Sequence, residues 1–128
     1  MPFDWNDFLS LAQRLARSTD DEASQRTAIS RAYYCVFNLA FARAEGTVGP
    51  KPKEASYHQW CWDQYTGTND RACKQLGNTG QRMKARRVRA DYRDADIRRL
   101  DDEVRRNLED ARGFLAALEV LNPRYPLP

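Results

Sequence analysis

The sequence predicts an all-α protein, an up-and-down helical bundle of four to five helices. Apolar residues recur at helical spacing along several long segments, and no stretch alternates apolar and polar residues as a half-buried strand does. The 128 residues are enough to bury one core and too few for two ordinary domains. We therefore expect a single helical domain over residues 1–122, followed by an extended tail over residues 123–128.

The first two helices are predicted by their apolar spacing. A helix is expected over residues 4–18, where Asp4 is a suitable N-cap and the apolar residues share one face. Residues 21–45 contain neither Gly nor Pro and carry apolar and aromatic residues on more than one face. A helix with this pattern is covered on most sides, so we expect it to be the central helix of the bundle.

The rest of the chain is divided by helix breakers. Two Gly and two Pro residues make 46–55 a loop, and a short third helix follows over residues 56–65. Gly77 and Gly80 predict a broken helix between residues 70 and 90. An apolar stripe from Ile97 to Leu118 predicts a long last helix, capped by Asp94 or Asp96 and ended by the Asn-Pro pair at 122–123.

Charge is unevenly distributed along the chain. Residues 1–70 carry seven Lys and Arg against nine Asp and Glu, whereas residues 71–128 carry fourteen against nine. The densest basic cluster consists of Arg82, Lys84, Arg86, Arg87 and Arg89. Such a cluster is a candidate nucleic-acid-binding surface. It is equally typical of a solvated helix face, because six acidic residues lie among the ten basic ones of residues 82–106.

Cysteine and histidine usage indicates neither a metal site nor a cofactor. The three cysteines form no CxxC pair, and the chain has a single histidine, so neither a zinc site nor a disulfide framework is expected. We expect the three thiols to be packed in the core. No apolar run is long enough to cross a bilayer, and the first residues lack the pattern of a secretory signal, which together predict a cytoplasmic protein.

Three motifs follow one another in the order of a known family. The predicted central helix carries R-A-Y-Y-x-x-F over residues 31–37, His58 opens the third helix, and R-x-x-A-D-Y occupies residues 87–92. In these motifs the sequence resembles the HEPN domain family over roughly residues 8–121. The resemblance implies a small helical bundle that pairs as a homodimer and is encoded in toxin–antitoxin, phage-defence or nucleotidyltransferase-associated systems.

Active HEPN proteins are metal-independent endoribonucleases with an R-x(4–6)-H motif, and here the sequence departs from the family. No histidine lies at the required distance from Arg86, Arg87 or Arg89, because residues 91–96 read D-Y-R-D-A-D. RNA cleavage requires a base, an acid and a cation for the developing phosphorane charge. If the protein cleaves RNA, Arg87 is the candidate phosphate ligand. The candidates for proton transfer are Asp91, Tyr92 and His58.

A structural role for the same residues is the alternative. Arg31 and Asp91 have opposite charges and are expected to pair between the central helix and the last junction, with Tyr34 and Tyr92 adding hydrogen bonds. Arg87 can likewise pair with Asp91 or another buried acid. On this interpretation His58 is a polar residue whose hydrogen bonds are satisfied within the bundle.

Three functions are consistent with the sequence. The missing histidine favours a non-catalytic HEPN-like module that dimerises and binds RNA, a nucleotide or a partner protein such as an antitoxin or a nucleotidyltransferase. The alternative is a metal-independent HEPN endoribonuclease with a divergent active site. The third, a helical nucleic-acid-binding protein outside that family, is the least favoured, because a net charge of +3 is modest and no helix-turn-helix is evident.

Overall fold

The computed structural model describes residues 2–126, and for Arg93 the backbone alone. This part of the chain contains five α-helices and one π-helical turn and no strand, which confirms the all-α prediction. The elements are α1 (Asn6–Ala16), α2 (Glu22–Thr47), α3 (Tyr57–Thr66), α4 (Arg71–Val88), η1 (Arg89–Arg93) and α5 (Leu100–Val120). None of these helices is long and apolar enough to cross a membrane.

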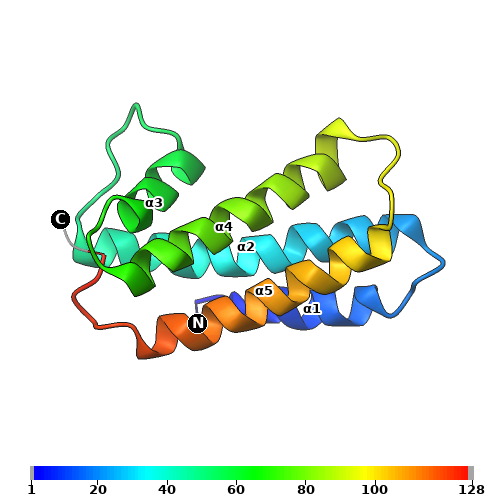
Figure 1. The fold of residues 1–128 in the computed structure, drawn as a ribbon, viewed down its shortest axis with the longest axis horizontal. Helices are drawn as coiled ribbons and strands as arrows, with labels where there is room; N and C mark the ends of the chain where they lie inside the picture. The colour runs from blue at the N-terminus through cyan, green and yellow to red at the C-terminus, as the bar shows by residue number, and fades with distance from the viewer. Residues whose placement is uncertain (1, 127–128) are drawn as a thin grey trace.

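The four longer helices lie side by side with α2 among them, and consecutive ones run in opposite directions along the long axis of the molecule (Figure 1). Helix α2 packs against α1, α3, α4, α5 and η1, so it is the centre of the fold as its composition predicts. The short helix α3 lies at one end of the bundle and packs mainly on α4. This arrangement brings the start of α3 and the end of α4 against the middle of α2.

Helix α2 begins at a local signal. Its N-cap is Asp21, whose carboxylate accepts hydrogen bonds from the backbone amides of Ala23 and Ser24. Along the helix, small and aromatic residues are fully buried, including Ala28, Ala32 and Tyr33. Small residues let the neighbouring helices approach closely, while the aromatic ones fill the space at the end covered by α3.

Helix α4 is continuous, so the predicted break at Gly77 and Gly80 is wrong. A Cβ atom at Gly77 would lie 2.5 Å from the Thr66 side chain, and one at Gly80 would lie 2.3 Å from the Trp62 ring. The two glycines therefore allow α3 to pack directly on the backbone of α4. The gain from this packing outweighs the low helix propensity of glycine, which costs about 1 kcal/mol per residue.

The last helix starts later than predicted. Residues 94–99 form a connection, and α5 begins after Arg99, whose φ of 52° is in the left-handed region. Neither Asp94 nor Asp96 caps it. At its other end, the Arg43 guanidinium of α2 donates hydrogen bonds to the carbonyl oxygens of Leu118, Leu121, Asn122 and Tyr125. The described part of the tail thus turns back onto α2 instead of extending into solvent.

All three cysteines, Cys35, Cys61 and Cys73, are buried and free, as predicted. Burial raises the pKa of the Cys61 thiol far above its ordinary value. These thiols are therefore packed core groups.

Candidate functional site

Arg87, near the end of α4, lies in the core with an exposed fraction of only 6%. Its guanidinium carbon lies 5.6 Å from the ring centroid of Tyr33, 5.3 Å from that of Tyr34 and 5.3 Å from that of Tyr92. Three phenol rings therefore surround one cation, an arrangement that cation–π attraction stabilises.

The polar contacts of Arg87 are few. The nearest carboxylate oxygen, Oδ2 of Asp91, is 3.8 Å from its Nη1 atom, which is too long for a hydrogen bond. The buried Nε atom has no hydrogen-bond partner among the described residues. A guanidinium has five N–H donors, and a buried one without partners is costly. Among the described residues, no side chain or carbonyl group accepts a hydrogen bond from the Arg87 guanidinium, and the Nε atom of Arg89 is in the same state.

Asp91 is held by α2 through Ser30. The Ser30 hydroxyl donates a hydrogen bond to Oδ2 of Asp91 over 3.0 Å, and Nη2 of Arg31 donates to the same Ser30 oxygen over 3.3 Å. Arg31 therefore approaches Asp91 through Ser30, and the direct ion pair expected between them does not form. Instead the Arg31 guanidinium lies 5.0 Å from the Tyr34 ring and 4.7 Å from the Phe8 ring. The predicted hydrogen bond from Tyr34 is replaced by these ring contacts.

A π-helical turn sets the direction of the residues after Arg87. In η1 the amide of Asp94 bonds to the carbonyl of Arg89, five residues back. Arg26 of α2 fixes this turn by donating to the carbonyl oxygens of Ala90, over 2.8 Å, and Ala95, over 3.2 Å. As a result Asp91 faces α2, whereas the ring of Tyr92 lies over Arg87 and is 75% exposed. Turns of this kind are frequent at functional sites.

His58, at the start of α3, joins the same site through Tyr33. Its Nδ1 atom lies 2.6 Å from the Tyr33 hydroxyl oxygen, and the Trp62 indole N–H donates to that oxygen over 3.1 Å. Because the indole is only a donor, the hydrogen of the Tyr33 hydroxyl is free to point at His58. We assign Nδ1 of His58 as the acceptor and Nε2 as the atom that carries the hydrogen.

The environment of His58 keeps its ring neutral. Burial, followed by the positive charges of Arg87 and Lys84, lowers the pKa of His58 to about 4. The ring also stacks on Phe37, with centroids 4.2 Å apart. At neutral pH the His58 ring is therefore uncharged. Burial likewise raises the pKa of Tyr33 far above its ordinary value, so Tyr33 stays protonated.

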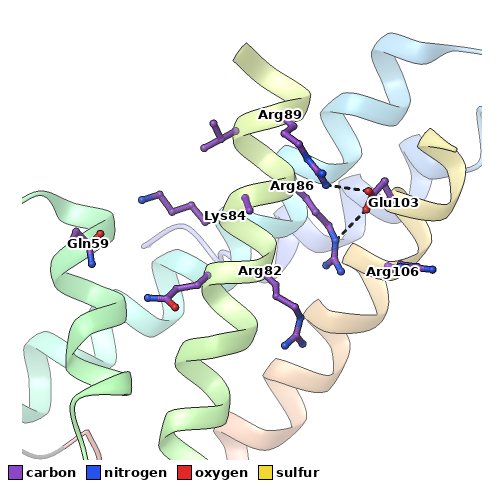
Figure 2. A pocket seen from close by; sticks show the side chains of 10 residues that line it. Gln59, Arg82, Lys84, Arg86, Arg89, Glu103 and Arg106 are labelled. Atoms are coloured by element: carbon purple, nitrogen blue, oxygen red, sulfur yellow. Dashed lines mark hydrogen bonds and ion pairs between the residues drawn. The ribbon is translucent and has the colours of Figure 1, made fainter. Parts of the chain in front are cut away.

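The basic cluster of α4 is divided between two sides of the helix. Arg82 and Arg86 form ion pairs with Asp110 of α5 over 3.2 and 2.6 Å. Arg86 and Arg89 both pair with Glu103, over 3.3 and 3.0 Å, as Figure 2 shows. Burial raises the pKa of Asp110, but hydrogen bonds from Arg86 and Arg82 outweigh this effect and lower it overall. Three of the five predicted nucleic-acid-binding residues thus also hold α4 against α5.

A hollow of about 690 Å³ covers the outer side of α4 (Figure 2). Its charged lining consists of Arg82, Lys84, Arg86, Arg89, Arg106 and Glu103. Lys84 extends to the side of α4 where Gln59 lies, and Arg106 lies on the α5 side (Figure 2). Among the described residues neither Lys84 nor Arg106 has an ion-pair partner within 4.0 Å. The hollow therefore keeps an excess of positive charge after its internal ion pairs are counted.

The sequence motifs do converge, but several of their partners were not foreseen. Tyr34, Asp91 and Tyr92 lie around the Arg87 guanidinium, and His58 reaches the same region through its contact with Tyr33. Sequence reasoning missed Ser30, Arg26 and Trp62, which hold Asp91, the π-helical turn and Tyr33. Nothing in the sequence marks these three, because each acts across more than 25 positions of the chain.

Comparisons with protein-family models, curated proteins and solved structures each found no match. The class that the fold and the site define is therefore an all-α bundle with a buried, incompletely bonded arginine beside a basic hollow. A guanidinium without a short hydrogen bond is suited to holding an oxyanion, because it is positively charged and all of its N–H groups are donors.

Proposed function

We propose that the protein is a HEPN-like module that binds a nucleic acid and holds one of its phosphates at Arg87. The observation that carries this proposal is the state of the Arg87 guanidinium. It is 6% exposed, its Nε atom has no hydrogen-bond partner in the described part of the chain, and its nearest carboxylate oxygen is 3.8 Å away. A phosphate oxygen supplies the short, charge-assisted hydrogen bonds that this group lacks.

The surroundings of Arg87 favour an anionic ligand. Among the described residues, Asp91 alone has a carboxylate oxygen within 4.0 Å of Arg87, and Ser30 already donates a hydrogen bond to this Oδ2 atom. Arg31 lies on the same Tyr34 ring as Arg87, and Lys84 is close enough to lower the pKa of His58. Lys84 also lines the hollow over α4, so it connects the Arg87 site to the remaining basic residues. Neighbouring phosphates of one strand can follow this path.

The HEPN assignment is supported by the way its motifs assemble. The R-A-Y-Y segment supplies two of the three rings around Arg87, and the R-x-x-A-D-Y segment supplies Arg87, Asp91 and Tyr92. We extend the proposal to a homodimer that works in a toxin–antitoxin or phage-defence system, with an antitoxin or nucleotidyltransferase as a candidate partner. Light scattering tests the dimer, and a monomer mass at micromolar concentration contradicts it.

A metal-independent endoribonuclease is the second candidate function. One observation favours it: His58 lies at the Arg87 site although it comes from a different helix than the family's histidine. Two observations weigh against it. A pKa of about 4 makes His58 a poor base at neutral pH, and its Nδ1 atom is engaged by Tyr33. Binding is therefore preferred over cleavage.

The test measures affinity for a fluorescein-labelled single-stranded RNA by fluorescence anisotropy at several salt concentrations. We expect log Kd to rise with log salt, and the slope to fall by about 0.7 for each phosphate contact removed. Lys84→Ala and Arg106→Ala should each weaken binding, because each removes a positive charge from the lining of the hollow. Neither residue forms an ion pair among the described residues, so the fold should be unchanged. Arg14→Ala, at an exposed position on α1, is the control and should bind as the wild type does.

Two results would contradict the proposal. One is the absence of binding at low salt, and the other is equal binding by all four proteins. A gel of the same RNA after incubation separates the two candidate functions. Intact RNA supports the binding module, whereas cleavage that survives EDTA and is lost in Arg87→Lys with an unchanged fold supports the nuclease.

A further inference from the structure

Tyr92 is the most exposed of the site's aromatic residues. Its side chain is 75% exposed, although one face of the ring is covered by the Arg87 guanidinium at 5.3 Å. The ring is not on a loose loop, because Arg26 holds the carbonyls on either side of it, at Ala90 and Ala95. A rigid phenol ring with one covered face and one open face is a platform for a planar ligand.

We infer that Tyr92 stacks one unpaired base of the nucleic acid whose phosphate binds Arg87, so that the ligand is a single strand. This inference rests on the proposed function and adds to it the class of nucleic acid. Aromatic platforms beside a basic groove are the way in which proteins hold single strands, and each stacked base contributes about 1–3 kcal/mol. Here the basic groove is the hollow over α4, whose lining includes Lys84 and Val88 but not Arg87 itself.

The burial of Arg87 argues against a duplex. Only 6% of this residue is exposed and the Tyr92 ring lies over its guanidinium, so a phosphate that binds it must come close to the surface of the bundle. The phosphates of a duplex lie on a stiff double helix, and its bases are already stacked on both faces. A single strand can turn one base onto Tyr92 while its phosphate enters the site.

The orientation of Tyr92 also favours stacking over proton transfer. Its guanidinium contact is made by the ring face, and none of the described residues bonds to its hydroxyl group. What this side chain offers a ligand is mainly ring surface. Tyr92→Phe should therefore preserve its role, whereas a proton-transfer role would be lost in that variant.

The experiment compares Tyr92→Leu with Tyr92→Phe in binding a fluorescein-labelled 12-nucleotide RNA, the DNA strand of the same sequence, and the corresponding duplexes. We expect Tyr92→Leu to weaken single-strand binding about tenfold and Tyr92→Phe to change it by less than about twofold. Duplex binding should be weaker in the wild type and should not respond to either change. Tyr57→Leu is the matched control, since Tyr57 is 60% exposed but lies against Phe41 and Lys51.

The outcomes distinguish this inference from the proposed function. If Tyr92→Leu binds single strands as the wild type does, while binding still falls with salt, stacking is wrong and the proposed function stands. If Tyr92→Leu loses affinity equally for the single strand and for the duplex, the preference for single strands is wrong. If the wild type binds none of the four nucleic acids, both proposals are wrong. Binding of RNA and DNA strands alike supports stacking, and binding of RNA alone adds a contact to the 2′-hydroxyl.

Discussion

The Tyr33 hydroxyl oxygen lies 2.6 Å from Nδ1 of His58. Trp62 donates to the same oxygen, so one buried hydroxyl joins α2 to two successive turns of α3. This contact decides which tautomer of His58 is present, with Nδ1 as the acceptor and the hydrogen on Nε2. It also makes the hydroxyl of Tyr33 a group whose removal leaves two partners without a bond.

Removing the Tyr33 hydroxyl should therefore destabilise the protein. In Tyr33→Phe the buried indole N–H of Trp62 loses its acceptor, and an unsatisfied buried donor costs about 1–3 kcal/mol. Urea unfolding followed by circular dichroism measures the loss. Tyr57→Phe, which removes an exposed hydroxyl, should change the free energy of unfolding by less than about 0.5 kcal/mol. Equal stability of the two variants would show that the contact contributes nothing.

His58 should make stability depend on pH. Its pKa is lowered to about 4 in the folded protein, against an ordinary value of 6.5, so the unfolded chain binds more protons between these values. The contribution of the neutral His58 ring to the free energy of unfolding is present in full above pH 6.5, and it is lost as the pH falls toward 4. The free energy of unfolding should thus fall more steeply over this window in the wild type than in His58→Gln. Because His58 is the only histidine, its ring proton can be followed directly by NMR. A titration midpoint near pH 6.5 would show that folding does not lower the pKa of His58.

Arg87 and Asp91 should behave as a coupled pair. Arg87→Lys keeps the charge but loses the planar contact with three rings, and Asp91→Asn removes the charge that faces it. We expect each change to cost about 1–3 kcal/mol and the double variant to cost less than the sum. The measurement is a double-mutant cycle of unfolding free energies. If the two changes in unfolding free energy add exactly, Arg87 and Asp91 do not interact across the 3.8 Å between them.

Two glycines should respond in opposite ways to the same substitution. In Gly80→Ala the new Cβ would lie 2.3 Å from the Trp62 ring, so α3 must move away from α4 and the melting temperature should fall. In Gly113→Ala the Cβ meets nothing within 4 Å, and the better helix propensity of alanine should add about 0.5–1 kcal/mol. Thermal unfolding of the two variants tests this. A rise in melting temperature for Gly80→Ala would show that α3 does not pack on this glycine.

The comparison of Gly80 with Asp21 shows which parts of the fold the sequence could predict. Asp21 acts on amides two and three residues away, so its helix start is visible in the sequence. Gly80 is explained only by Trp62, eighteen positions earlier, and a local pattern therefore predicted a break where the helix continues. The start of α5 was missed for a related reason, since Arg99 adopts a left-handed conformation that no residue type signals.

The candidate site could likewise be predicted from the sequence only in part. The motifs that resemble the HEPN family pointed to Arg87, Asp91 and His58. In the structure Asp91 lies 3.8 Å from Arg87, and His58 contacts Tyr33, whose ring packs on Arg87. Their surroundings could not be predicted, because Arg82 and Arg86 find Asp110 across 24 positions or more, and Ser30 finds Asp91 across 61. Those contacts decide that Arg86 is mostly occupied within the bundle whereas Arg87 is left without a short hydrogen bond.

Binding of a nucleic-acid phosphate by the Arg87 guanidinium can be tested at the guanidinium itself. The Nε–H group of a buried arginine can be observed by ¹⁵N NMR, and Arg87→Lys assigns its signal. On addition of a single-stranded RNA we expect the Arg87 Nε–H signal to shift downfield as it gains a charge-assisted hydrogen bond. RNA that binds, as judged by anisotropy, while the Arg87 signal stays in place would contradict the account.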